Sequence, residues 1–368
     1  MNNKTKNAVV TLVIGVLFLA LSIFCWVKAP DEFSYSERRT LAKFPEINAE
    51  NIASGTAMSN FETYTLDQFP MRDTFRTVKA LISRYALAQK ENNDLYYTDG
   101  HIASLDYPLD TSSVLRAASR FEYVVSKYAS ASNNIYLSLI PDKNYFLADS
   151  NGYPSLDYSE LTSLLLENCP SMKYIDIFPT LSTDSYYRTD THWSQDKIIN
   201  TASFLAEALG TSIPSAADKY TAHTLDADFS GVYAGQIMLP TKKDRITYLT
   251  NTIIDSFTTH DYENDKDIEI YTLEKADGPD PYEIFLNGPI SLIEINNPEI
   301  NNDSKLIIFR DSFSSSLAPL LAQGYSQTIL VDIRYISPDF VGSFVDFENA
   351  DILFLYSTSV INNSITLK

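Results

Sequence analysis

The chain has 368 residues, of which 45% are hydrophobic, and its 47 acidic and 28 basic side chains give a net charge of −19. This length and hydrophobic content are enough for one large or two modest domains with a sizeable core. The acidic excess leaves no stripe of lysine and arginine to neutralise phosphates, which argues against nucleic acid as a partner.

A membrane span is predicted near the N-terminus. Residues 8–27 form an almost uninterrupted apolar run of 20 residues. At about 1.5 Å rise per residue, a helix of this length crosses a hydrocarbon core of roughly 30 Å. Lys4 and Lys6 precede the run, and Asp31 and Glu32 follow it. The positive-inside rule therefore places the N-terminus in the cytoplasm and the rest of the chain outside, in a periplasm or the extracellular space.

A cleaved signal peptide is the alternative to an uncleaved signal anchor. No A-x-A-like cleavage site follows the apolar run, so we expect the anchor to stay in place. Cys25 lies within the span and cannot pair with Cys169, so we expect no internal disulfide in the exported part.

The chain is expected to divide into three segments. A cytoplasmic tail and transmembrane anchor cover 1–28, a linker with helical and hairpin elements packed on the core covers 29–110, and an α/β domain covers 111–368. In the second segment, apolar residues recur at helical spacing from 60 to 92 and are interrupted at Pro70, which predicts two helices. Asp99-Gly100 predicts the turn of a hairpin.

From residue 111 onward, helical and strand patterns alternate. We predict helices over 111–128, 159–167, 194–209 and 315–323, and strands over 135–140, 174–178, 305–309, 328–333 and 351–355. Residues 211–300 interrupt this order with short Thr-, Tyr- and Ile-rich runs, which predicts a β-rich insertion. Short apolar strands joined by helices indicate a parallel sheet flanked by helices on both faces.

Two short motifs supply the parts of a Ser-His-Asp site. A serine hydroxyl needs an imidazole to accept its proton, and the imidazole needs a carboxylate to fix its tautomer. Of the four histidines, His101 and His192 have an aspartate two positions upstream. His101 follows the predicted hairpin turn, whereas Asp190 and His192 precede a predicted helix, which makes His192 the first choice as the base.

Ser312 is the candidate nucleophile. It follows the apolar strand 305–309 and precedes a predicted helix, which is the strand-turn-helix context of a nucleophile elbow at the C-terminal edge of a sheet. The usual G-x-S-x-G pattern is absent. The alternative is that Asp311 or Ser312 caps the following helix, that Asp190 caps its own, and that His192 is a packed polar residue.

The combination of motifs resembles the DHHW family of bacterial exported proteins, which is related to the SGNH-hydrolase-like alginate O-acetyltransferases. The matching segments run in order through most of the exported chain: 36–41 (SERRTL), 61–64 (FETY), 67–72 (DQFPMR), 141–143 (PDK), 187–193 (YRTDTHW), 311–313 (DSF) and 332–335 (DIRY). The chain departs from the family name at Thr191, which replaces the first histidine of D-H-H-W. This departure puts in doubt any second role for that imidazole, such as substrate binding.

The resemblance implies an SGNH-like fold in which Ser312 is the nucleophile, His192 the general base and Asp190 the orienting carboxylate. The oxyanion would be stabilised by the backbone N–H of Ser312 and by one further donor. Because they follow predicted strand ends, the candidates for that donor, or for substrate contacts, are Lys143, Asn144, Arg334 and Tyr335.

The resemblance further implies an O-acetyltransferase or esterase that acts on a cell-envelope or secreted polysaccharide, with a membrane-bound acyltransferase as the source of acetyl groups. The rival hypothesis is a non-catalytic polysaccharide-binding or scaffold protein with a degenerate site. We expect no metal site, since zinc-binding histidine or cysteine motifs are absent, and no nucleotide cofactor, since glycine-rich phosphate loops are absent.

Overall fold

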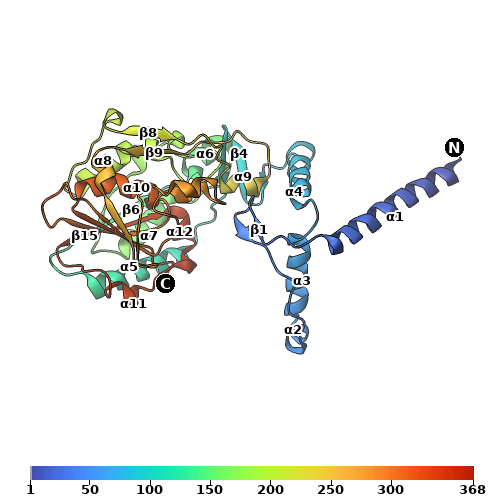
Figure 1. The fold of residues 1–368 in the computed structure, drawn as a ribbon, viewed down its shortest axis with the longest axis horizontal. Helices are drawn as coiled ribbons and strands as arrows, with labels where there is room; N and C mark the ends of the chain where they lie inside the picture. Colours follow the sequence, from blue (N-terminus) through green and yellow to red (C-terminus); the bar gives the residue numbers. More distant parts are fainter. Residues whose placement is uncertain (1) are drawn as a thin grey trace. The chain divides into compact units, whose positions relative to one another are not determined.

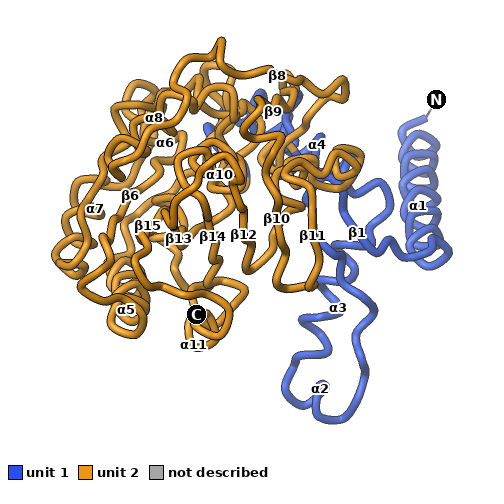
Figure 2. The backbone as a smooth tube through the Cα atoms, turned by 60° about the vertical axis from the view of Figure 1, so that its left-hand side comes forward, with its two compact units in different colours: residues 1–92, 235–240 blue, residues 93–234, 241–368 orange. Residues whose placement is uncertain are grey.

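A computed structural model of the chain describes residues 2–368. The chain forms two compact units (Figure 2). We call residues 2–92 with 235–240 the N-terminal unit, and residues 93–234 with 241–368 the α/β unit.

The α/β unit is built on an eight-stranded sheet with the order β11-β10-β12-β14-β13-β15-β6-β7. Five strands form its parallel part: β14 (Gln327–Val331), β13 (Lys305–Arg310), β15 (Ala350–Ser357), β6 (Asn134–Ile140) and β7 (Lys173–Tyr174). Their side chains alternate between the two faces, as Ile307 and Ile308 show by entering different cores. Nearly continuous apolar strands of this kind are typical of a sheet that is buried on both sides.

Helices cover both faces of this sheet, so the predicted fold is confirmed (Figure 1). On one face, α8 (Ile199–Ala208) and α10 (Ser314–Leu321) contribute to a core that includes Leu306 and Ile308. On the other face, α5 (Thr111–Tyr128) and α7 (Tyr158–Glu167) pack in a core that includes Ile307 and Phe309.

The β-rich region predicted at 211–300 does not form one separate body. Its strands β8 (Thr221–Thr224) and β9 (Thr247–Thr250) form a separate two-stranded antiparallel sheet, whereas β10 (Thr258–Asp261), β11 (Lys266–Ile268) and β12 (Leu292–Asn296) extend the main sheet. They join it antiparallel through β12 and β14. Antiparallel neighbours need only short connections, which is how three strands are added to one edge without further crossover helices.

Two predicted elements are shorter than expected. The strand predicted over 174–178 ends at Tyr174. The helix predicted over 194–209 begins at Ile199, after a 3₁₀ turn at Gln195–Lys197. Tertiary bonding explains the delay, because the buried Gln195 amide donates to the carbonyl of Ser316 (2.7 Å) and accepts from the N–H of Leu249 (2.7 Å).

The N-terminal unit contains the apolar helix α1 (Asn3–Val27), which is long and apolar enough to cross a membrane and which also fits a signal sequence. Further helices are α2 (Ala49–Ala53), α3 (Thr56–Asp67) and α4 (Arg72–Leu81), which a single π-turn η1 (Ile82–Ala86) continues. The break predicted at Pro70 lies between α3 and α4. In the α/β unit, the predicted hairpin is formed by β4 (Leu95–Thr98) and β5 (His101–Ser104), with Gly100 at a φ of +79°.

Candidate active site

The loop that carries Asp190 and His192 is closed by backbone pairing. Tyr186 and Trp193 form an antiparallel bridge, and the N–H of Tyr187 donates to the carbonyl of His192 (3.0 Å). Residues 188–191, which lie between Tyr187 and His192, must therefore turn sharply, and this turn brings the Asp190 and His192 side chains together.

Asp190 is fully buried and held from two sides. Its Oδ1 accepts from the backbone N–H of His192 (3.1 Å) and its Oδ2 from that of Val232 (2.9 Å). The neighbouring segment approaches so closely that a Cβ on Gly231 would lie 2.4 Å from the Cβ of Asp190. Only glycine fits this contact without moving the carboxylate.

His192 links the carboxylate to the serine. Its Nδ1 lies 2.7 Å from Oδ1 of Asp190, and its Nε2 lies 2.8 Å from Oγ of Ser312. An ionised carboxylate only accepts hydrogen bonds, so the shared proton belongs on Nδ1 and Nε2 is free to accept the serine proton. The imidazole also stacks on the buried ring of Tyr282, with centroids 3.9 Å apart and planes 10° apart.

Ser312 lies at the C-terminal end of β13, and Asp311 shapes the turn that presents it. The buried Asp311 carboxylate accepts from the N–H of Phe313 (3.0 Å) and from the N–H of Ser357 at the end of β15 (2.7 Å). Neither side chain of this dipeptide caps α10, whose start has no side-chain cap: Asp311 holds the turn before the helix, and the Ser312 hydroxyl is directed to His192.

Trp193 fastens the two motifs together. Its buried indole N–H reaches the carbonyl of Phe313 (3.0 Å) and the hydroxyl of Ser316 (3.0 Å). Because the tryptophan directly follows His192, this contact fixes the distance between the histidine loop and the serine turn.

Ser312 and His192 open onto a cavity of about 170 Å³. Of the four predicted oxyanion or substrate residues, Arg334 and Tyr335 line it. Arg334 is committed to Asp332, with two hydrogen bonds of 2.9 and 2.6 Å. Burial works against its charge, but these bonds raise the pKa of the guanidinium.

Lys143 and Asn144 do not line this cavity, so a direct oxyanion role for them is not supported. The Lys143 ammonium donates to the carbonyls of Tyr187 (3.0 Å) and Arg188 (3.3 Å). Burial lowers its pKa to about 7, against the opposing effect of Asp190 and other carboxylates. Both residues begin α6 (Lys143–Asn151), whose direction turns their side chains toward internal partners.

Sequence reasoning missed two residues that shape the site. Arg310, the last residue of β13, is buried beneath the cavity and donates to the hydroxyl of Ser315 (2.8 Å) and the carbonyl of Ile290 (3.1 Å). Tyr282 supports the imidazole from a 3₁₀ turn within the irregular 211–300 region. For Arg310, its place directly after an apolar strand was the one available signal, because charges are rarely buried without a partner.

Comparisons with known proteins concern the family and the fold. The family model described as "DHHW protein" matches residues 176–331. The resemblance to the DHHW family is confirmed. No curated protein matches the chain.

Solved structures share the fold. A DHHW family protein from Eubacterium siraeum is 22% identical with a TM-score of 0.60, over 74% of this chain and 93% of that one. Bacillus cereus PatB1 is 17% identical with a TM-score of 0.58, over 73% and 96%. A second PatB1 structure, with a sulfonyl adduct, is 21% identical with a TM-score of 0.58, over 73% and 95%.

Proposed function

We propose that this chain is a membrane-anchored, extracytoplasmic O-acyltransferase or esterase that acts on acetyl groups of a cell-envelope or secreted polysaccharide. The observation that carries the proposal is the unbroken series of contacts from Asp190 through His192 to Ser312, at 2.7 and 2.8 Å. A base within 2.6–3.2 Å of the nucleophile, itself oriented by a third group, is the arrangement that activates a serine hydroxyl.

In the first half-reaction, Oγ of Ser312 attacks the carbonyl carbon of an acyl donor, and its proton moves to Nε2 of His192. Asp190 stabilises the resulting imidazolium. The bond to the donor's leaving oxygen then breaks, that oxygen takes the proton from His192, and an acyl-serine remains. In the second half-reaction, a sugar hydroxyl or water gives its proton to the same nitrogen and attacks the ester carbonyl. The bond from that carbon to Oγ of Ser312 then breaks, and Oγ takes the proton back from His192.

The negative oxygen of each intermediate needs a donor. Within residues 2–368, the backbone N–H of Ser312 has no hydrogen-bond acceptor, so it is available for this oxygen. The adjacent cavity is small, at about 170 Å³. Pockets for drug-sized ligands hold roughly 300–1,000 Å³, so the size favours a short acyl group such as acetyl over a long chain.

Location and partners are also part of the proposal. We assign α1 as an uncleaved anchor that leaves the α/β unit outside the cytoplasmic membrane. The resemblance to envelope acetyltransferases supports a polysaccharide as the acceptor, and a membrane-bound acyltransferase as the partner that supplies acetyl groups where acetyl-CoA is not expected.

The test is acetyl release from p-nitrophenyl acetate by the full chain in detergent, with and without oligosaccharide acceptors. S312A and H192A are expected to lose turnover, and S315A is the matched control, because Ser315 lines the same cavity but contacts Arg310. A sulfonyl fluoride should modify wild type and S315A but not S312A, the counterpart of the adduct seen on PatB1. Equal background rates in all variants would favour the non-catalytic scaffold.

A further inference from the structure

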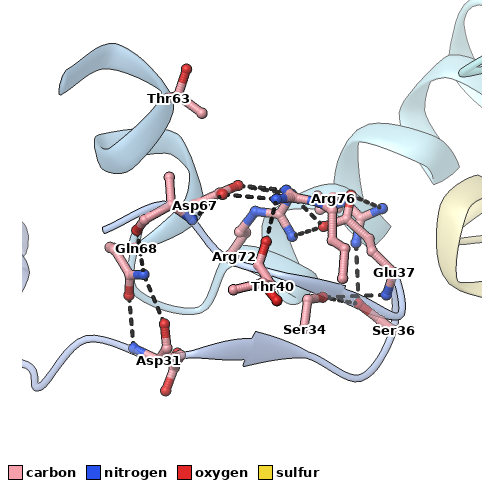
Figure 3. Close-up of polar contacts among 12 residues, drawn as sticks. Asp31, Ser34, Ser36, Glu37, Thr40, Thr63, Asp67, Gln68, Arg72 and Arg76 are labelled. Atoms are coloured by element: carbon pink, nitrogen blue, oxygen red, sulfur yellow. Dashed lines mark hydrogen bonds and ion pairs between the residues drawn. The ribbon is translucent and has the colours of Figure 1, made fainter. Parts of the chain in front are cut away.

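Two segments matched in the N-terminal unit, 36–41 and 67–72, meet in a network of ion pairs (Figure 3). Arg39 binds the buried Asp67 with both nitrogens, at 2.5 and 2.8 Å. Glu37 pairs with Arg72 at 2.6 Å and with Arg76 at 3.3 Å. The charged side of α4 is therefore directed into the unit.

The corner between α3 and α4, which carries Gln68, is also hydrogen-bonded to the segment that follows the predicted membrane span. The side-chain oxygen of Gln68 accepts from the backbone N–H of Asp31 (2.8 Å), and its amide donates to the carbonyl of Asp31 (2.9 Å) (Figure 3). Only residues 28–30 lie between this clamp and the end of α1 at Val27. Val27 and Asp31 are four Cα–Cα steps apart, which span at most about 14 Å, so the corner between α3 and α4 stays close to the end of α1.

Helix α4 and the turn η1 have their apolar side exposed. Ala80 and Ser83 are buried on the side that carries Arg72 and Arg76. The exposed stripe follows helical spacing from the corner onward: Met71, Phe75, Val78, Ile82 and Tyr85, which are 59, 47, 45, 50 and 78% exposed. A water-facing helix has the opposite pattern, so this stripe requires a non-polar partner.

Residues 28–92 and residues 93–368 differ in net charge. Residues 28–92 carry nine basic and nine acidic side chains, whereas residues 93–368 carry 17 basic and 38 acidic ones, a net charge of −21. An outer leaflet with anionic lipids repels the second part but not the first. With no basic excess, attachment of residues 28–92 to lipid must come from apolar burial.

We propose that the apolar stripe of α4 and η1 lies in the outer interface of the lipid bilayer, parallel to the membrane plane. The inference rests on the proposed anchor, because the span and the Gln68–Asp31 clamp bring the stripe to the lipid. Phe75, Val78 and Ile82 enter the acyl boundary by about 5–10 Å, while the ion pairs on the opposite side of α4 remain in the protein.

The test uses the full chain in phosphatidylcholine vesicles with or without lipids brominated near the headgroup end of their acyl chains. F75W is made in a W26F background, which removes the tryptophan of the span. F344W is the matched control, because Phe344 is 51% exposed and Phe75 47%. Bromine should reduce the emission added by F75W, and by V78W as a second probe, at least about twofold, and leave that added by F344W unchanged.

Alkaline carbonate extraction separates the two possible failures. Release of the chain from the vesicles would show that α1 is not an anchor, and both the docking and the membrane location given in the proposed function would then be wrong. Retention without quenching at F75W and V78W would overturn the docking alone. If F75W is shielded from water in a concentration-dependent way but not quenched, a second copy of the chain covers the stripe, and the lipid docking is overturned. Equal quenching at F344W and F75W would also overturn it.

Discussion

Each of the two units is stabilised internally, and the interactions that do so differ between them. The α/β unit has an extensive apolar core on each face of its sheet. Apart from the prolines Pro45 and Pro70, residues 2–92 bury only Leu41, Ala57 and Ala80 among their apolar side chains, yet they also bury Asp67 and Gln68. Residues 28–92 expose 13 large apolar side chains, against 10 in the four times longer 93–368.

This difference assigns separate roles to the two units. A site that must hold three side chains within hydrogen-bond distance needs a rigid scaffold, and the well-packed sheet supplies one. A unit with few buried apolar groups depends on its ion pairs and on its surroundings for stability. Substitutions in the α/β unit should therefore change activity without changing the stability of the N-terminal unit, and substitutions in the N-terminal unit should leave activity unchanged.

The largest expected effect is on chemistry in the α/β unit. In D190N the amide stabilises the wrong tautomer of His192, so kcat/KM for p-nitrophenyl acetate should fall by about 10³–10⁴-fold, with little change in the free energy of unfolding. D218N replaces an exposed carboxylate of the same unit and should retain full activity. Activity of D190N near that of wild type would exclude Asp190 from the mechanism.

A second effect tests how rigid the site must be. In G231A, the new Cβ would displace Asp190, because it would lie only 2.4 Å from the Cβ of that residue. We expect kcat/KM to fall by about 10²-fold per folded molecule, since small misplacements of catalytic groups cost about this much. G324A is the control, because its Cβ meets the side chain of Thr211 at 2.7 Å, away from the triad. Equal losses in both variants would point to general destabilisation.

The N-terminal unit should respond to loss of its ion pairs. D67N removes the negative charge and one of the two oxygens that accept from Arg39, and should lower the free energy of unfolding of this unit by about 1–2 kcal/mol at pH 7, with acetyl release unchanged. Hydrogen exchange of the α3 and α4 amides gives the measurement. D73N changes an exposed partner of Arg76 and should have almost no effect. Equal protection in D67N and wild type would contradict the role of the network.

The smallest effect is a pH dependence of the same unit. Hydrogen bonds from Arg39 lower the pKa of Asp67 to about 2. The unfolded chain has the ordinary value of about 3.9, so it binds more protons in this range and the stabilisation, complete above pH 4, is lost as the pH falls toward 2. In D67N, exchange of the α3 and α4 amides should lose this acid sensitivity. A retained transition would assign it to another carboxylate.

Local pattern was sufficient for much of the fold. Short apolar runs predicted the parallel strands, period-3.6 spacing predicted the helices α5 and α7, and the proline predicted the break at Pro70. The motifs also singled out Asp190, His192 and Ser312, which the structure brings together, although their catalytic role stays a prediction. These features are encoded within a few neighbouring residues, and the tryptophan that joins the two motifs is itself part of one of them.

Only the tertiary structure decided which surfaces meet. The sequence placed Lys143 and Asn144 beside Arg334 and Tyr335 as equivalent candidates, but α6 turns the first two toward internal partners. It gave no sign that β10–β12 would complete the main sheet or that α4 would bury its arginines and expose its phenylalanine. Periodicity determines that a helix has two different sides, whereas the partners present in space determine which side is buried.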